Sequence, residues 1–156
     1  MSNVPRRVFL MTAASAMAVV AGAEFGAAQT GSPPAGRRTA LSGYDPVAYF
    51  TEGRAQKGVD AFWFAFDDAI YLFRDAAHRA MFAADPERYA PQYAGFCAGG
   101  ISKGYKVEPD PEAWAILNGK LFVFQFKDRV ADFKRDLSFI EKANANWPGL
   151  HDAPIK

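Results

Sequence analysis

The chain has one cysteine, Cys97, and this thiol lies in a stretch that is rich in glycine. The glycines around it are Gly95, Gly99, Gly100 and Gly104. Glycine lets the backbone turn sharply or approach another group closely. A lone cysteine cannot form a disulfide within the chain. In an oxidising compartment it is a metal or cofactor ligand, an intermolecular pairing partner or a buried small hydrophobe.

A histidine and a methionine form a second group that could bind a metal. His78 and Met81 are three residues apart, so on a helix they share a face. Imidazole together with a thiolate or thioether suits copper better than magnesium or calcium. We therefore expect His78 and Cys97 to be ligands of a transition metal ion, with copper as the first guess. In the alternative interpretation Met81 packs in the core and His78 lies at a solvated helix start.

Aromatic residues make up 15% of the chain, which favours a second hypothesis. Five of them flank turns and glycines: Tyr44, Tyr49, Tyr93, Phe96 and Tyr105. An aromatic body with a polar tip suits a pocket for a small ligand or a protein partner. Tyr44 and Tyr93 are the candidate ligand-binding residues of such a metal-free module. Alternatively, these rings pack between the sheet and the helices.

A thiol enzyme is the third hypothesis, with Cys97 as nucleophile and His78 as its base. The chain has only two histidines, and the other, His151, lies in a C-terminal segment that we expect to be loose. The sequence contains no oxyanion motif, glycine-rich phosphate loop or Ser-His-Asp order. We therefore expect a binding protein without catalytic residues rather than an enzyme.

The first 28 residues are typical of an export signal. Arg6 and Arg7 precede an apolar, alanine-rich run over 8–23, and no acidic residue occurs before Glu24. The run is too short and too rich in alanine for a membrane span, which needs about 20 strongly apolar residues. The order resembles a twin-arginine signal, which predicts a periplasmic or secreted protein with no membrane span after cleavage. An uncleaved membrane anchor is the alternative.

The charge left after signal removal argues against nucleic acid and anionic lipid as partners. Removing residues 1–28 takes away Arg6, Arg7 and Glu24, which leaves 18 − 2 = 16 basic and 17 − 1 = 16 acidic side chains. A net charge near zero provides no field that attracts a polyanion. The next segment, 29–39, is rich in Gly and Pro and predicts a linker. We expect one domain over 40–150, a tail over 151–156 and no internal repeat.

The local patterns predict an α+β fold, a small antiparallel sheet built from hairpins and packed with about three helices. Asn118-Gly119 predicts a two-residue hairpin turn between apolar runs, and Asp67-Asp68 predicts a second one. Asp75 is the expected N-cap of a helix over 76–84, and Asp85-Pro86 begins a short helical turn. Three further elements are expected: a strand over 47–50, a helix over 92–98 ended by Gly99-Gly100, and an amphipathic helix over 128–144.

Several segments together resemble the YHS-domain family, in its exported single-domain branch. The matching residues are Gly43–Phe50, Tyr71–Phe73, Phe82, Asp85-Pro86, Tyr89, Pro91–Tyr93, Gly95, Cys97, Ser102–Gly104, Asp110-Pro111, Trp114, Gly119–Leu121 and Asn144–Pro148. They follow the family order over roughly residues 40–150. The related TRASH-type modules bind metals, often copper, through cysteines, and the resemblance implies such a role here. The positions of those cysteines are occupied by Ala48, Arg74 and His78, of which only His78 can bind a metal.

Overall fold

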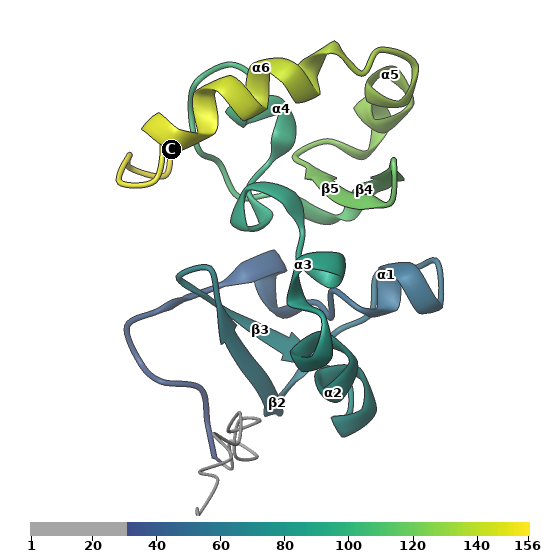
Figure 1. Cartoon of the computed structure of the whole chain (residues 1–156), viewed down its shortest axis with the longest axis vertical. Coiled ribbons are helices and arrows are strands. Elements are labelled where there is room, and N and C mark those ends of the chain that lie inside the picture. The colour runs from purple at the N-terminus through teal and green to yellow at the C-terminus, as the bar shows by residue number, and fades with distance from the viewer. Residues whose placement is uncertain (1–30) are drawn as a thin grey trace, which may run out of the picture.

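Two β-hairpins, each preceded by a short helix and followed by further helices, form the framework of the protein (Figure 1). This computed structural model describes residues 31–156, and the export signal predicted over 1–28 lies outside them. No helix of the described residues is both long and apolar enough to cross a membrane. Figure 1 shows the two hairpins in separate halves, stacked along the longest axis of the molecule.

The first half contains a three-stranded sheet. Strand β1 (Arg38–Thr39) pairs in parallel with β3, and β2 pairs antiparallel with the other edge of β3. The last two residues of the predicted linker are therefore part of the sheet. The elements that follow β1 are η1 (Ala40–Gly43), α1 (Ala48–Thr51), β2 (Val59–Phe66), β3 (Ala69–Phe73), α2 (Ala76–Ala84) and α3 (Pro86–Tyr89).

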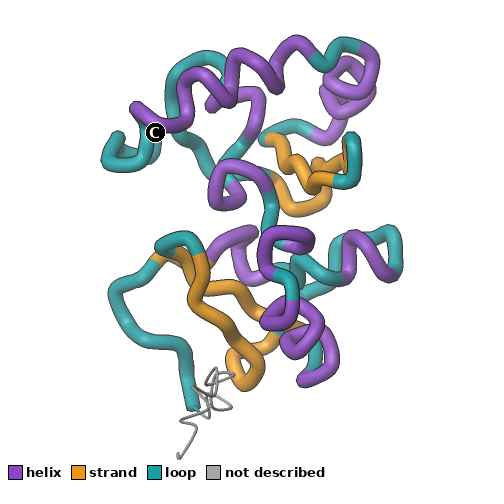
Figure 2. Tube along the Cα trace, viewed as in Figure 1, coloured by secondary structure: helices purple, strands orange, loops and turns teal. Residues whose placement is uncertain are grey.

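The second half contains a two-stranded sheet and the C-terminal helix α6 (Figure 2). Its elements are η2 (Gln92–Gly95), α4 (Ala98–Ile101), β4 (Asp110–Leu117), β5 (Lys120–Phe124), η3 (Lys127–Arg129), α5 (Val130–Arg135), α6 (Ser138–Asn146) and η4 (Trp147–Gly149). The order short helix, hairpin and two helices is that of the first half, with the additional 3-10 helices η3 and η4.

The two halves are an internal structural repeat, which contradicts the expectation that the chain has none. The strand pair Val59↔Phe73 corresponds to Asp110↔Phe124, and the register of both hairpins shifts immediately afterwards. The spacing is the same on both strands, because 110 − 59 and 124 − 73 are both 51. The parallel partner recurs as well, since an isolated bridge joins Pro91 to β5 in the way that β1 joins β3.

The backbone before each short helix repeats the same unusual conformation. Three consecutive residues with positive φ precede α1, and three more precede α4. They are Leu41, Ser42 and Gly43 in the first half and Tyr93, Ala94 and Gly95 in the second half. Residues other than glycine rarely adopt this left-handed conformation, so two such triplets at matching places support the repeat.

The described residues form two apolar cores, and the first core also includes two buried residues of β5 from the second half. In the first half Phe82 of α2 packs on Phe73 of β3, with ring centroids 5.2 Å apart. In the second half Phe133 of α5 stacks on Phe124 of β5 at 4.3 Å. An aromatic ring from the helix after the hairpin thus covers the last residue of the second strand in both halves. Burial of such rings against a hairpin is a large favourable contribution to folding.

The α+β class is confirmed, and so are both hairpin turns. Asp67 and Asp68, like Asn118 and Gly119, have the positive φ of a two-residue hairpin turn. The Asp75 N-cap is also confirmed, because its carboxylate accepts a hydrogen bond from the His78 amide. The sheet is divided into two small sheets, and residues 31–156 contain six short α-helices where about three helices were expected.

Three local predictions were wrong. Residues 47–50 are helical instead of extended, because the Asp45 carboxylate accepts the Val47 amide and starts a turn. The segment 92–98 is not one helix, since the positive φ values interrupt it, and Gly99-Gly100 lie inside α4. The segment 128–144 is divided between α5 and α6. Asp136 is extended there, and its carboxylate accepts the Ser138 amide.

The tail over 151–156 is packed rather than loose. The His151 ring lies 4.6 Å from the ring of Trp147, measured between centroids. Ile155 forms a parallel bridge with Lys106, and the ammonium of Lys106 donates to the carbonyl oxygen of His151 at 2.7 Å. The tail therefore belongs to the second half.

Candidate functional site

A buried carboxylate organises the polar residues of the first half. Asp45 is fully buried, and its two oxygens accept hydrogen bonds from the amides of Val47 at 2.9 Å and Arg74 at 3.0 Å. Its Oδ2 atom also lies 2.7 Å from Nδ1 of His78, which is 5% exposed. The carboxylate is thus held from three sides, and each contact comes from a different element of the half.

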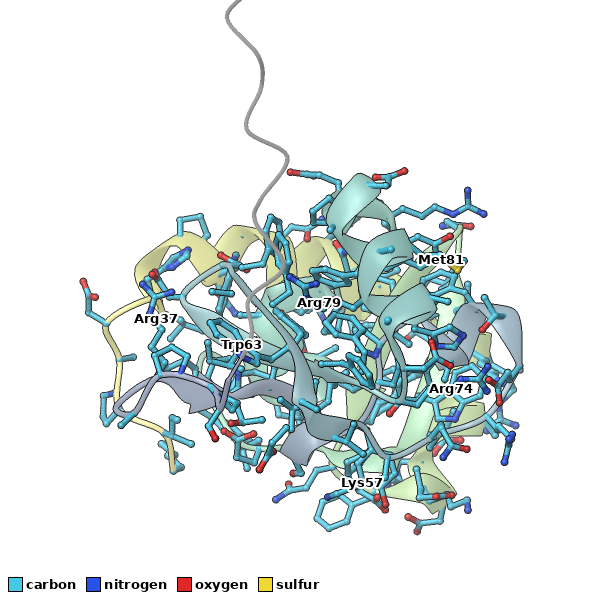
Figure 3. The ribbon with its side chains drawn as sticks, turned by 90° about the horizontal axis from the view of Figure 1, so that it is seen from below. Arg37, Lys57, Trp63, Arg74, Arg79 and Met81 are labelled. Carbon is cyan, nitrogen blue, oxygen red and sulfur yellow. The ribbon has the colours of Figure 1, made fainter. Side chains whose placement is uncertain are left out.

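The polar side chains around this carboxylate contact one another. Arg74 pairs with Glu52 and, at 2.8 Å, with Asp75. The hydrogen bond from the His78 amide, and then that from Arg74, lowers the pKa of the Asp75 carboxyl below its usual value. Nε2 of His78 lies 3.5 Å from Oγ1 of Thr51 and 3.9 Å from Oε1 of Glu52. Figure 3 shows Arg74 and Met81 toward the same edge of this half, where Met81 is 36% exposed.

These residues do not fit the thiolate metal site that the family resemblance implies. Ala48 is fully buried and offers no donor atom, and the guanidinium of Arg74 is engaged with two carboxylates. Only the His78 imidazole remains as a ligand, whereas thiolate metal sites use three or four. Within residues 31–156 no group of three or more His, Cys, Asp and Glu side chains is arranged to hold a metal ion.

Cys97 lies in the second half, at the position that Asp45 occupies in the first. Each comes two residues after the last positive-φ glycine, Gly43 or Gly95. The Asp45 amide donates to Gln56 O at 2.8 Å, and the Cys97 amide donates to Val107 O at 3.0 Å. The two loop carbonyls are again 51 positions apart, since 107 − 56 = 51.

The structure does not bring Cys97 and His78 together. His78 belongs to α2 of the first half, whereas Cys97 precedes α4 of the second half, and these helices lie at opposite ends of Figure 1. The two expected tyrosines are also apart. Tyr44 packs against the first core, with the Lys57 ammonium 4.8 Å from its ring centroid. Tyr93 is buried in the second core, where burial raises its pKa to about 12 and its hydroxyl donates to Oδ1 of Asn144.

An open pocket of about 370 Å³ lies beside Cys97. Its polar lining consists of Cys97, Lys103, Gln125, Asp128 and Arg129, and Gly99 and Gly100 form part of the wall. Two of these side chains are cationic and one is anionic. The remaining lining is aromatic, from Tyr105, Phe126 and Phe133. The pocket therefore combines cationic groups with flat apolar surfaces.

Sequence reasoning identified Cys97 but missed the cationic side of this pocket. Lys103 and Arg129 come from different elements, and only the tertiary structure places them on one wall. The feature that points to this side of the pocket is Phe126, which is 58% exposed and lies outside both cores. Exposed aromatic side chains are frequent at binding sites.

Comparison with family models, with curated proteins and with solved structures found no match to this chain. The likeness to YHS domains stays a prediction that depends on the residues of the chain itself.

Proposed function

We propose that this protein is an exported YHS-type binding protein, and that it holds a small organic ligand in the pocket beside Cys97. The observation that carries the proposal is the composition of that pocket. It is open to solvent, its volume of about 370 Å³ suits a small molecule, and its lining combines aromatic rings with charged groups. The matching place in the first half is filled by the protein's own side chains, Asp45 and His78.

The chemistry of the lining favours binding over catalysis. Both histidines are far from a catalytic arrangement with the thiol, because the His78 ring is bonded to Asp45 and the His151 ring packs on Trp147. A nucleophilic cysteine needs a base within hydrogen-bond reach. The proposed role is therefore that of a carrier, sensor or accessory module in the periplasm or outside the cell.

The single thiol of the chain provides a direct test. Cys97 is only 5% exposed, so we expect iodoacetamide to alkylate it slowly, and a ligand that fills the pocket to slow this reaction further. Ligand-observed NMR should show that the same ligand no longer binds once Cys97 is alkylated. The matched control is Cys97→Ser, which has no thiol to alkylate, so its pocket stays open after the same iodoacetamide treatment. Binding that survives alkylation of the thiol would contradict the proposal.

A transition metal ion, copper first, is the second candidate ligand, and one observation favours it. Nδ1 of His78 is held by the Asp45 carboxylate, which is how metal-binding histidines are commonly oriented so that Nε2 faces the ion. Oγ1 of Thr51 and Oε1 of Glu52 lie nearest to Nε2. We expect His78→Ala to lower the copper content of the purified protein, with Cys97→Ala as the matched variant in the other half. Equal copper content in the wild type and both variants would remove this candidate.

A further inference from the structure

We propose that the pocket beside Cys97 binds the carboxylate of a small aromatic or apolar acid, and that this carboxylate, next to the thiol, is held by the groups that correspond to those that hold Asp45 in the first half. The inference depends on the proposed function, since it specifies the ligand of the same pocket. It follows from the internal repeat, in which one half contains the anion and the other half lacks it.

The first half shows how this fold holds a carboxylate. Asp45 accepts the amide of Val47, two residues further on, and the amide of Arg74, which directly follows β3. The third contact is Nδ1 of His78, in the helix after the hairpin. Two main-chain N–H groups and one side-chain nitrogen thus surround a carboxylate that is shielded from water.

The second half presents the corresponding groups without the carboxylate. Gly99 is two residues after Cys97, Gln125 directly follows β5, and Arg129 is the counterpart of His78, because 125 − 74 and 129 − 78 are both 51. All four residues line the one pocket. No hydrogen bond to an acceptor within residues 31–156 uses the amide of Gly99 or that of Gln125. The thiol of Cys97 is a weak acceptor and cannot replace a carboxylate.

One charge beside the site is reversed between the halves. Each short helix is followed by a glycine with positive φ. In the first half the residue before this glycine is Glu52, which pairs with Arg74. Its counterpart in the second half is Lys103, which precedes Gly104 and lines the pocket. Arg129 is paired with Asp132 at 3.2 Å, and Lys103 and Asp128 are the other charged residues of the lining. A ligand that brings its own negative charge would therefore meet Lys103, where the first half has the acidic Glu52.

The aromatic side of the pocket specifies the rest of the ligand. Phe126 occupies the position of Asp75, since 126 − 75 = 51, so a capping carboxylate of the first half is replaced by an apolar ring. Phe126 and Tyr105 line the mouth together with Phe133. A flat apolar body attached to the carboxylate would pack on these rings. Benzoate and phenylacetate are simple acids of this class.

The test compares acids with their uncharged amides. We expect the purified protein to bind benzoate and phenylacetate about tenfold or more tightly than benzamide and phenylacetamide, because hydrogen bonds to a charged group are the stronger ones. Equal affinity for acid and amide would overturn the carboxylate inference and leave the proposed small-ligand pocket intact. If neither form binds, or binding survives alkylation of Cys97, the proposed function fails as well.

One substitution is designed to supply the missing anion from the chain. In Cys97→Asp the new carboxylate can accept the amides of Gly99 and Gln125, as Asp45 accepts those of the first half. We expect benzoate affinity to fall at least tenfold in this variant and to fall less in Cys97→Ser, which introduces no charge. Lys103→Ala should weaken benzoate binding, and Lys134→Ala, on α5 outside the pocket, should not. Undiminished benzoate binding by a folded Cys97→Asp protein would overturn the inference.

Discussion

The buried carboxylate of the first half should be far more important for stability than the thiol at the matching place in the second half. Asp45→Ala removes the acceptor of three donors: the amides of Val47 and Arg74, and Nδ1 of His78. Each buried donor left without a partner costs about 1–3 kcal/mol. With three such donors, we expect Asp45→Ala to lower the free energy of unfolding by about 3 kcal/mol or more.

The equivalent truncation in the second half gives the control. Cys97→Ala removes one buried sulfur and leaves no donor unpaired, so its cost should be close to that of a small buried group, about 1 kcal/mol. Urea denaturation of both variants at neutral pH measures the difference. Asp45→Asn keeps the volume and one acceptor oxygen, and should fall between the two. Equal losses for Asp45→Ala and Cys97→Ala would refute the view that only the first half contains its own anion.

Three other substitutions or conditions test the packing. Gly99→Ala should lower the free energy of unfolding by about 1–3 kcal/mol, because the added Cβ would lie 2.6 Å from Cζ of Phe133. The control is Gly149→Ala, whose Cβ would meet no atom within 4 Å and which should be neutral in the same urea titration. Asp68→Gly should raise stability by about 1 kcal/mol, since Asp68 has a φ of 57°, and an unchanged thermal midpoint would contradict this. Burial raises the pKa of Tyr93 from 10.0 to about 12, so the unfolded chain loses this proton first. The stability that the Tyr93 hydroxyl contributes is complete below pH 10 and is lost as the pH rises through 12. Tyr93→Phe should lose less stability over this range, and identical alkaline unfolding of both proteins would argue against the shift.

The features that the sequence predicted correctly are those that depend on neighbouring residues. Asn118-Gly119 is a hairpin turn because its two residues tolerate positive φ, and Asp75 is an N-cap because its carboxylate reaches an amide three residues away. In two of the wrong predictions a carboxylate also accepts a nearby backbone amide, but the sequence pattern favoured a different element there. Asp136 divides a helix that the apolar periodicity favoured as continuous, and Asp45 starts a helical turn where a strand was expected.

The internal repeat was missed because the halves share few identical residues. Among the identities that recur at a spacing of 51 are Trp63 with Trp114, Phe73 with Phe124, Phe82 with Phe133, and Asp85 with Asp136. They form the hairpin, the ring that covers it and the start of the next helix, so they could have been found by searching for that spacing. The polar residues around the two sites differ in every charge, which is why a search for similar motifs fails there.

The expectation of a shared metal site paired the two residues with the most evident chemistry, His78 and Cys97. Their separation follows from the repeat, because each belongs to the polar site of its own half. The partner of His78 is Asp45, and the position that faces Cys97 is occupied by Arg129. Only the tertiary structure shows that these are two versions of one arrangement.

The most direct measurement is an amide NMR titration of the protein with benzoate. We expect the amide protons of Gly99 and Gln125 to move downfield as they donate to the added carboxylate, while those of Val47 and Arg74, already bonded to Asp45, keep their positions. Resonances of Gly99 and Gln125 that do not move while benzoate binds elsewhere would contradict the account.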